Sequence, residues 1–483
     1  MISILNLLLL IVFIYLIKSN YKKYIKFTNN DLKGPFPLPI IGNLHNLGEK
    51  PHITCEQLVK KYGKIYRLYF GDCYTVVVSD IDIIKELFLN NHESLKERPL
   101  TPSFKHCSDD EHGILLSSKR WDRNREMLQK VMKKINIKEL YKMIYDQVED
   151  MVLSFKSFEN SGEALPVRLV ATRFTLSTMF KYIFNEKVSY NEDINTGVVS
   201  MFAEWLEFVF DMVGVGHVGD YIEILKPFYS LYLKQFEHYV PIGRDFVYQR
   251  YIKHVKKLES LNEESNCLLD LLIREYNTDD SEDARDIVAN CLDMLVAGTD
   301  TPSKTLEWTI LNLVNHQDIQ ENVYQEIKRV VGDRDKVKLG DRPSTPYFNS
   351  VCKEVIRIHS IVPFGVPRII NKDLMLKGFY IPKGSQVVIN YRALNHDKKY
   401  FQNPEDFDPQ RFIDGDSAAY LPFSLGKRNC IGRELASSII YLFLSNLLLN
   451  YKISSIDNKP LEINENFGIN IKPNSFKIVL NKR

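Results

Sequence analysis

The sequence predicts a mainly α-helical domain with a small β-rich subdomain, preceded by a single N-terminal membrane-anchor helix. Apolar residues recur at helical spacing through most of the chain, and stretches with strand-like patterns are few. The first 17 residues are apolar and carry no charge. With 483 residues, 45% of them hydrophobic, the chain is long enough to bury one large core or two smaller ones.

The anchor is predicted over residues 1–17, a length at the short end of the range for a membrane-spanning helix. A cleaved signal peptide would have a basic residue before its apolar run, whereas the first lysines, Lys18 to Lys26, all follow it. Positive charge on that side favours a cytosolic location for the domain that follows. We therefore expect an uncleaved anchor, a basic and proline-rich hinge over residues 18–43, and one globular domain over residues 44–483.

Within the globular domain, apolar periodicity predicts helices over residues 54–61, 80–90, 120–134, 138–157, 167–185, 195–211, 227–256, 267–275, 283–313, 316–331, 346–359 and 432–449. Strands are predicted over residues 65–70, 73–78, 374–376 and 386–390, with short pieces after residue 451. The first two strands place the β-rich subdomain near the N-terminus.

Charge and cysteine usage narrow the function classes. The net charge is only +2, which gives no reason to expect a nucleic-acid partner. We find no phosphate-cradling glycine loop and no zinc-type cysteine spacing. The seven cysteines are odd in number and scattered, a pattern that indicates reduced thiols and no disulfide framework.

The segment Phe423-Ser-Leu-Gly426-Lys-Arg428-Asn-Cys430-Ile-Gly432 is the most informative part of the chain. Its glycines let the backbone turn tightly and approach a flat partner, and its arginine supplies positive charge, so the loop can present one sulfur as a thiolate. For the cysteine alone, an inert buried thiol is the alternative. The spacing Phe-x-x-Gly-x-Arg-x-Cys-x-Gly resembles the haem-binding signature of the cytochrome P450 family, the haem-thiolate monooxygenases.

The resemblance covers the chain from about residue 33 to the end, and it is to the microsomal eukaryotic type. It implies the cytochrome P450 fold and haem b (iron protoporphyrin IX) as the cofactor, with Cys430 as the iron ligand. Phe423, Gly426, Arg428 and Gly432 are then the cofactor-binding residues of the loop. It also implies the endoplasmic reticulum membrane as the location, with membrane lipid as a contact and the catalytic domain in the cytosol.

A second motif, Ala297-Gly298-Thr-Asp300-Thr301-Pro302, ends an apolar helical run. By itself it could be a helix C-cap at Gly298 followed by a turn. The family resemblance instead implies a long central helix that crosses one face of the haem, with Thr301 and Asp300 as the catalytic residues that deliver protons during oxygen activation. Pro302 stands where the family more often has Thr or Ser, and we expect it to kink the helix and free the Gly298 carbonyl.

Two further sets of residues fit the same family. Glu354 and Arg357 are three apart on one helix face, and the resemblance implies that Arg411 joins them in a structural network behind the haem loop. Taken alone, the helical pair is common and worth only a few tenths of a kcal/mol.

The two haem propionates would require cationic partners. Trp121 and Arg125 resemble the Trp-x-x-x-Arg pair that reaches a propionate in this family, and Arg368 and Arg428 are the other expected clamps. Each arginine could instead lie on the surface.

The sequence contains no recognisable flavin or nicotinamide site, so electrons must come from a partner. The resemblance implies NADPH–cytochrome P450 reductase, with cytochrome b5 as an additional candidate. A basic patch for docking is predicted from Arg123, Lys130, Lys133, Lys134 and Lys427, with an ordinary solvated helix face as the alternative.

Together these features predict a monooxygenase that inserts one atom of O2 into a hydrophobic small molecule. The pocket is expected to be lined by residues 98–116, residues 202–225, the helix face of Leu292, Leu295, Val296 and Ala297, residues 361–366 and the turn at Phe467, which are rich in apolar side chains. A haem-thiolate isomerase or dehydratase that needs no O2 and a non-catalytic haem-binding sensor remain as alternatives. The sequence does not specify the substrate.

Overall fold

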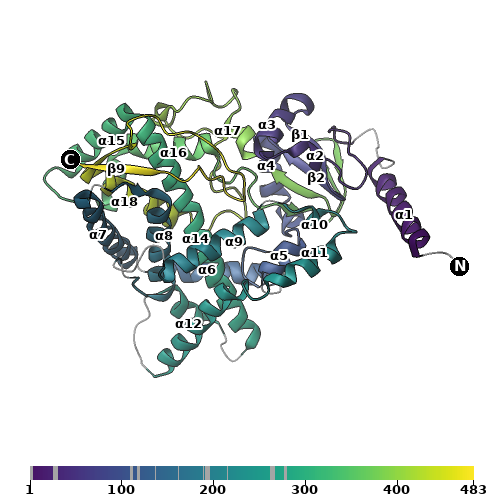
Figure 1. The fold of residues 1–483 in the computed structure, drawn as a ribbon, viewed down its shortest axis with the longest axis horizontal. Helices are drawn as coiled ribbons and strands as arrows, with labels where there is room; N and C mark the ends of the chain where they lie inside the picture. The colour runs from purple at the N-terminus through teal and green to yellow at the C-terminus, as the bar shows by residue number, and fades with distance from the viewer. Residues whose placement is uncertain are drawn as a thin grey trace.

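The structure is a computed structural model that describes residues 4–24, 31–108, 112–116, 120–135, 137–161, 163–188, 190, 196–214, 216–260, 267–276 and 280–483. It is mostly helical with small β regions, as the sequence predicts (Figure 1). Residues 25–30 of the predicted hinge, and residues 109–111 and 215 of the predicted pocket segments, lie outside the described residues.

The described helices are α1 (Ile4–Tyr24), α2 (Leu44–Leu47), α3 (Pro51–Tyr62), α4 (Ile81–Lys85), α5 (Pro102–Cys107), α6 (Trp121–Lys134), α7 (Ile137–Ser161), α8 (Val167–Phe184), α9 (Val198–Gly214), α10 (Val218–Tyr221), α11 (Lys226–Leu233), α12 (Pro241–Ser260), α13 (Leu268–Glu275), α14 (Ser281–Asn315), α15 (Gln317–Val331), α16 (Pro346–His359), α17 (Tyr391–Asn395) and α18 (Arg433–Asn450). The described strands are β1 (Ile65–Phe70), β2 (Cys73–Val78), β3 (Leu165–Pro166), β4 (Arg368–Ile369), β5 (Leu374–Leu376), β6 (Phe379–Ile381), β7 (Gln386–Ile389), β8 (Tyr451–Ser454) and β9 (Lys477–Lys482).

Helix α14 runs through the middle of the molecule (Figure 1). The Asp280 side chain caps its N-terminus by accepting a hydrogen bond from the Glu282 N–H. Every residue from Pro302 to Val314 is buried, because other helices surround this half of α14. The helix therefore forms a rigid axis to which the surrounding elements are fixed.

The largest core cluster joins α7, α8 and α18 on one side of α14. The rings of Phe174 and Phe443 meet edge to face with their centroids 4.9 Å apart, and Phe155 contacts Phe443 in the same manner. Burial of each such ring stabilises the fold by roughly 1.5–3 kcal/mol. This packing fixes α18, which directly follows the cysteine loop, against the central helices.

The predicted β-rich subdomain is present, but it draws on both halves of the chain. Its sheet has the order β1-β2-β7-β4, with β2 parallel to β7 in the register Thr75↔Gln386. The smaller sheet β3-β9-β8 lies at the C-terminal end of the molecule, away from α1 (Figure 1). Sequence patterns could not predict this pairing, because β2 and β7 are separated by some 300 residues.

One predicted helix, over residues 227–256, is divided in the structure. Helix α11 ends at Leu233, a short 3₁₀ turn follows, and α12 begins at Pro241. Proline disfavours helical backbone in the residue before it, whereas its own fixed φ suits the first position of a helix. The apolar periodicity continues across this boundary, so the sequence pattern did not indicate that the helix divides there.

The predicted membrane anchor is not supported. Among the described helices, none is long and apolar enough to cross a bilayer. At 1.5 Å per residue, the uncharged part of α1 from Ile4 to Ile17 would extend about 21 Å, less than the roughly 30 Å of a hydrocarbon core. The expectation of a single-pass anchor in the endoplasmic reticulum membrane is therefore wrong.

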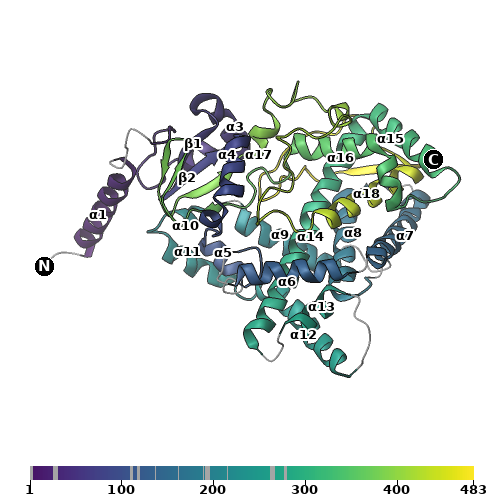
Figure 2. The same cartoon turned by 180° about the vertical axis from the view of Figure 1, so that it is seen from behind.

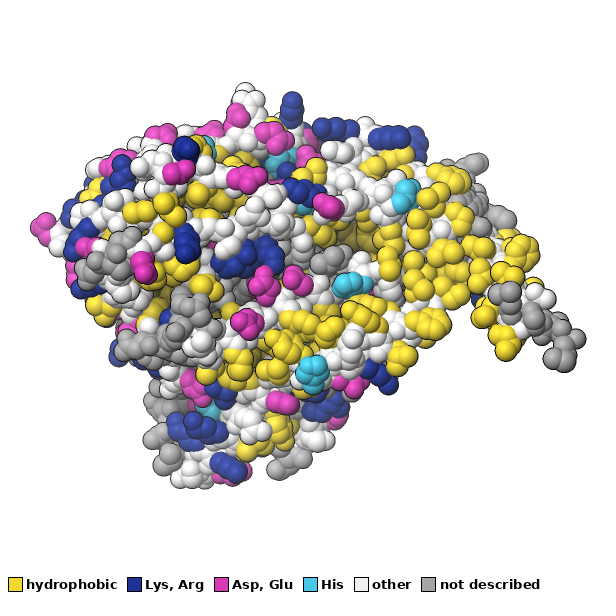
Figure 3. Space-filling model, viewed as in Figure 1, with side chains coloured by type: hydrophobic (Ala, Val, Ile, Leu, Met, Phe, Trp, Pro, Cys, Tyr) yellow, Lys and Arg dark blue, Asp and Glu magenta, His cyan; other side chains and the backbone are white. Residues whose placement is uncertain are grey.

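Apolar side chains gather at the end of the molecule that carries α1 (Figure 3). Ile4 in α1 is 80% exposed, and Phe36 in the proline-rich segment is 70% exposed. Exposed apolar surface of this kind is typical of a contact area.

The proline-rich segment is folded against the sheet. Lys33 accepts a hydrogen bond from the Arg67 N–H at 2.9 Å, and Gly42 forms a bridge with Phe70, so the segment follows the edge of β1. Asn43 is fully buried, and its amide oxygen accepts a hydrogen bond from the Tyr69 N–H at 2.8 Å. Residues 33–43 of the predicted hinge thus pack on the β-rich subdomain, whereas residues 18–24 belong to α1.

Candidate active site

One large cavity, with an empty volume of about 1810 Å³, lies beside α14. The cysteine loop and the start of α18 form one part of its wall, and α14 contributes another part. The segment from Ile361 to Val366 closes a third side. Cys430 and Thr301 both face this cavity, although 129 positions separate them in the sequence.

The cysteine loop is shaped by residues with left-handed backbone. Gly426 has φ of +74°, and a Cβ atom there would lie 2.2 Å from the Phe88 carbonyl oxygen, so only glycine fits. Ser424 also has a positive φ, and its hydroxyl accepts a hydrogen bond from Tyr391 at 2.9 Å. The Cys430 N–H donates to the Phe423 carbonyl at 3.0 Å, which closes the loop around the sulfur.

Cys430 is exposed to the cavity, while protein surrounds it on its other sides. Burial raises the pKa of its thiol, and the Gly432 N–H and the positive charges of Arg125 and Arg433 act in the opposite direction. The other cysteines of the chain are buried or half-buried. Cys430 is thus the cysteine whose sulfur is presented to an open space.

Four arginines line the same cavity: Arg98, Arg125, Arg368 and Arg428. Burial lowers the pKa of Arg368 to about 10, and burial together with the nearby Arg368 charge lowers the pKa of Arg428 to about 9. Burial also lowers the pKa of Arg98, and Arg368 and Arg428 lower it further. A buried group of cations that repel one another is suited to an anionic ligand.

The predicted clamps differ in how they reach the cavity. Arg125 lines it and donates two hydrogen bonds of 2.8 Å to Asn429, next to the cysteine. Trp121 does not line the cavity; its ring supports the Arg428 guanidinium at 4.1 Å, and its indole N–H donates to the Ile114 carbonyl. Gly426 likewise shapes the loop from outside the cavity lining.

Thr301 and Asp300 face different cavities. Thr301 lines the large cavity, and its hydroxyl donates to the Ala297 carbonyl at 3.0 Å. Asp300 instead lines a second cavity of about 1020 Å³ between α8, α9 and α14. There Asn470 donates a hydrogen bond of 2.5 Å to its carboxylate, and Lys304 lies 3.8 Å away.

Helix α14 continues through Pro302 without a break. Nearby hydroxyl groups bond to backbone carbonyls: Thr301 to Ala297, and Ser303 to Asp300 at 2.8 Å. The expected kink is thus not accompanied by an interruption of the helix. The Gly298 carbonyl still lacks a partner N–H four residues later, because proline has none.

The predicted Glu-Arg-Arg network is assembled. Arg357 donates from Nε and Nη2 to the two carboxylate oxygens of Glu354, each at 2.7 Å. Arg411 adds a bond of 3.0 Å to the same carboxylate. Glu354 and Arg357 are fully buried, and Arg357 also donates to the Asn395 and Pro404 carbonyls. The network therefore ties α16 to the segment that precedes the cysteine loop.

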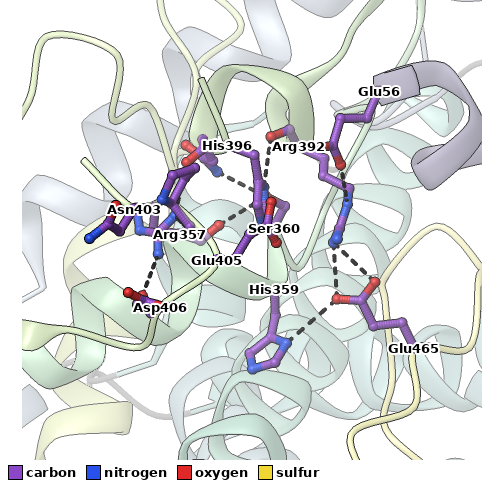
Figure 4. A network of polar contacts seen from close by, with 12 residues as sticks. Glu56, Arg357, His359, Ser360, Arg392, His396, Asn403, Glu405, Asp406 and Glu465 are labelled. Carbon is purple, nitrogen blue, oxygen red and sulfur yellow. Dashed lines mark hydrogen bonds and ion pairs between the residues drawn. The ribbon is translucent and has the colours of Figure 1, made fainter. Parts of the chain in front are cut away.

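A second polar network lies beside it and was not predicted (Figure 4). Arg392 donates at 2.8 Å to Glu56 of α3 and at 3.0 Å to both carboxylate oxygens of Glu465. Figure 4 shows Arg392 between these two acids, with His359 directed at Glu465. His52 and His359 lie 3.0 and 3.6 Å from the same carboxylate. This network fixes the turn that carries Phe467.

Asp293 is an active-site residue that sequence reasoning missed. Its carboxylate lines the large cavity and accepts hydrogen bonds of 2.8 Å from the Ile114 and Leu115 N–H groups. Burial raises the pKa of Asp293 to about 7, although the two N–H groups oppose the shift. Gly113 has φ of +87°, and a Cβ there would meet the Asp293 carboxylate at 2.4 Å. An isolated Asp in an apolar helix gives no signal of such a contact.

The predicted pocket segments are partly correct. Residues 361–366 and the ends of the 98–116 segment line the large cavity. The prediction that one face of the helix lines the cavity is wrong for three of its four residues. Leu292, Leu295 and Val296 pack into the core, and of the four only Ala297 faces the cavity. Of residues 202–225, those that line a cavity face the second one. Phe467 packs against Phe364, which lines the large cavity, with ring centroids 6.0 Å apart.

The fold and the site together define a class of protein. The helical domain encloses one accessible cysteine and several buried arginines in a single cavity, and such a cavity can bind a flat anionic cofactor through a thiolate. Comparison with known proteins identifies the class. The family model "Cytochrome P450" matches residues 32–480. The probable cytochrome P450 508A2 of Dictyostelium discoideum is 40% identical over 97% of this chain and 98% of its own length, and the probable cytochrome P450 508A1 of that organism is 41% identical over 97% of each.

Solved structures agree with this result. A zebra fish cytochrome P450 structure with progesterone has a TM-score of 0.78 at 25% sequence identity, covering 90% of this chain and 99% of its own. The chain belongs to the cytochrome P450 family. Members of this family are haem-dependent monooxygenases that use O2 and electrons from an NADPH-dependent reductase.

The cavity of this chain fits haem. It has room for a macrocycle, and it places a thiol and a group of guanidinium groups on its walls. The Nε atoms of Arg125 and Arg368 are buried and have no hydrogen-bond partner in the described part of the chain. This is expected for hydrogen-bond donors that bind an anionic ligand. Cys430 supplies the soft anionic donor that haem iron accepts in this family.

Proposed function

We propose that this protein inserts one oxygen atom from O2 into a hydrophobic small molecule, with electrons supplied by NADPH–cytochrome P450 reductase. The observation that carries the proposal is the single cavity that contains both the Cys430 sulfur and the Thr301 hydroxyl. A cofactor held at the sulfur would face the helix that carries the hydroxyl. The remaining walls are largely apolar, with Ile361, Val362 and Phe364 among them.

Haem bound at Cys430 would supply the redox chemistry of oxygen activation. The residues that would hold it are Cys430 through its thiolate, and Arg98, Arg125, Arg368 and Arg428 through charge-assisted hydrogen bonds to its propionates. Arg98 was not predicted in this role. Trp121 keeps the Arg428 side chain in place from behind.

Thr301 and Asp300 divide the task of proton delivery. The Thr301 hydroxyl can hold and pass a proton within the large cavity, because it lines that cavity and already bonds to the Ala297 carbonyl. Asp300 faces the second cavity, where Lys304, Glu307 and Arg168 form a buried chain of ion pairs. Because Asp300 and Thr301 are adjacent on α14, protons are proposed to pass from the second cavity to the first through these two residues.

The substrate is proposed to be an apolar molecule of drug or lipid size. A zebra fish relative of similar fold is recorded with progesterone, a molecule of this kind. The Oδ1 atom of Asp293, on the same wall, accepts neither of the two backbone hydrogen bonds and can orient a polar substituent.

The reductase is proposed to dock on the cysteine side, although its basic surface is weaker than predicted. Lys130 and Lys134 share Glu275, Arg123 is paired with Asp283, and Lys427 lies 3.0 Å from Glu93. These acids neutralise much of the patch. Reversal of Lys133 and Lys134 to Glu should still slow reductase-supported turnover and weaken its salt dependence, and unchanged kinetics would contradict this docking face.

Replacement of Thr301 tests the proposed reaction. Thr301→Ala should leave the haem spectrum and substrate binding intact but lower the product formed per NADPH by at least about tenfold, with hydrogen peroxide released instead. Thr301→Ser retains the hydroxyl and serves as the control. Product formation without NADPH and O2 would favour the isomerase or dehydratase, and absence of any product with every bound ligand would favour a sensor.

A further inference from the structure

A compact cluster of three metal-ligating side chains lies away from both cavities. His254 on α12, Cys267 directly before α13 and Asp270 in the first turn of α13 bring one donor atom each within 4.8 Å of one another. All three side chains are more than nine-tenths buried. Helices α12 and α13 lie together below α6, at the lower edge of the molecule in Figure 2.

The donor set is specific in its chemistry. It combines a thiol, an imidazole and a carboxylate, the three ligand types that Zn²⁺ binds in proteins. Hard cations such as Mg²⁺ and Ca²⁺ prefer oxygen ligands alone, so sulfur and nitrogen donors disfavour them. One thiolate and one carboxylate would also neutralise the two charges of Zn²⁺, which lowers the cost of burying the ion.

We propose that His254, Cys267 and Asp270 form a three-ligand Zn²⁺ site that joins α12 to α13. His254 Nδ1 and Asp270 Oδ1 lie 2.5 Å apart, bridged by a proton. Tetrahedral coordination with bonds of about 2.0–2.3 Å needs donor atoms roughly 3.5 Å apart. Side-chain rotations that move His254 Nδ1 and Asp270 Oδ1 about 1 Å further apart would therefore open space for the ion. The three residues would leave a fourth position for water.

Zinc binding has a defined proton balance. A cysteine thiol has an ordinary pKa of about 8.5, so without metal the Cys267 sulfur carries its proton at neutral pH. Coordination forms a Zn–S bond and releases that proton to solvent, and no electron is transferred. The proton between His254 and Asp270 moves to the other ring nitrogen, so the imidazole coordinates as a neutral ligand.

Sequence reasoning found no zinc motif because the pattern is unusual. His-x12-Cys-x2-Asp has one cysteine, and its histidine belongs to a different helix. The site is independent of the haem-thiolate centre, since none of its residues lines the large cavity. Its role would be stability: an ion that binds only the folded chain raises the free energy of unfolding.

The test is the zinc-to-iron ratio of the haem-loaded protein, purified without a histidine tag and dialysed against submicromolar buffered zinc. The wild type should hold one zinc per haem iron, and excess Mg²⁺ should not displace it. Cys267→Ser and His254→Gln should each lower the affinity by at least about 100-fold. Cys55→Ser, at an equally buried cysteine outside the cluster, should bind zinc as the wild type does.

Calorimetry in buffers of different ionisation enthalpy gives a second readout, and should show release of about one proton per zinc near pH 7. Asp270→Asn preserves the side-chain shape and is included in case another variant fails to fold. A normal haem spectrum confirms that each variant is folded. A wild type that binds no zinc, or equal zinc contents in the wild type, Cys267→Ser and His254→Gln, would overturn the proposal and leave a hydrogen-bonded His–Asp pair.

Discussion

At the scale of single residues, the active site depends on charged and titratable side chains that are buried around the large cavity. The buried arginines of the cavity are suited to bind an anion, and Cys430 faces the same space. Asp293 is the corresponding acidic group on α14, tied to the backbone of Ile114 and Leu115. Its ionisation should therefore control how tightly this segment closes over the cavity.

Asp293 gives a pH prediction with a definite sign. Its pKa is about 7 when the segment is closed and near 3.9 when the carboxyl is in water, so the closed state binds the extra proton between these values. Closure must then weaken as the pH rises. Between pH 6 and pH 8 we expect hydrogen-exchange protection at Ile114 and Leu115, corrected for intrinsic rates, to fall about tenfold.

Asp293→Asn should abolish that dependence, because an amide does not titrate. The same corrected pH dependence in the variant and the wild type would contradict a role for the Asp293 carboxyl.

At the scale of elements, the turn that carries Glu465 and Phe467 is held by the network of Arg392 (Figure 4). Burial opposes ionisation of Glu465, but the nearby His359, the hydrogen bond with His52 and the charge of Arg392 lower its pKa. The same turn reaches α14 through Asn470, which holds Asp300. The network therefore supports both the wall of the large cavity and the acid of the second one.

Glu465→Gln should weaken this turn. The amide keeps one acceptor but loses the charge that pairs with Arg392, and we expect a loss of about 1.5–3 kcal/mol in the free energy of unfolding. Urea denaturation measures the loss, and substrate titration should show weaker binding. The exposed Glu462, replaced in the same way, is the matched control. Equal stability of the two variants would contradict the network's role.

Elements with local signals were predictable. The strands Ile65–Phe70 and Cys73–Val78 match the predicted bounds, because alternation along a strand is a local property. The two-residue strands β3 and β4 and the helix α17 were missed, since such short pieces are stabilised by distant partners. Likewise, the cysteine loop was predictable from its spacing, whereas Asp293, Arg98 and the Arg392 network depend on contacts between remote segments.

At the scale of the whole molecule, buried histidines make stability depend on pH. Burial and the charges of Arg392 and Arg357 lower the pKa of His396 to about 3. In the unfolded chain this imidazole titrates near 6.5, so between pH 6.5 and pH 3 the unfolded state binds one more proton. The free energy of unfolding should fall as the pH falls, by up to about 1.4 kcal/mol per pH unit.

His396→Gln should remove that component, so the stability of the variant should respond less to acid than that of the wild type. Urea midpoints at pH 7 and pH 5 measure the difference, with His238→Gln as the control on an exposed histidine. Identical acid responses of the wild type and His396→Gln would contradict this assignment.

The proposed reaction requires that haem be held by the Cys430 thiolate in the large cavity. The most direct measurement is the absorption spectrum of the reduced protein with carbon monoxide, recorded for the wild type and for Cys430→His. We predict a Soret band in the wild type that is strongly red-shifted from that of histidine-ligated haem, and loss of this shift in the variant. A wild-type band at the histidine-type position, or an unchanged band in Cys430→His, would contradict the account.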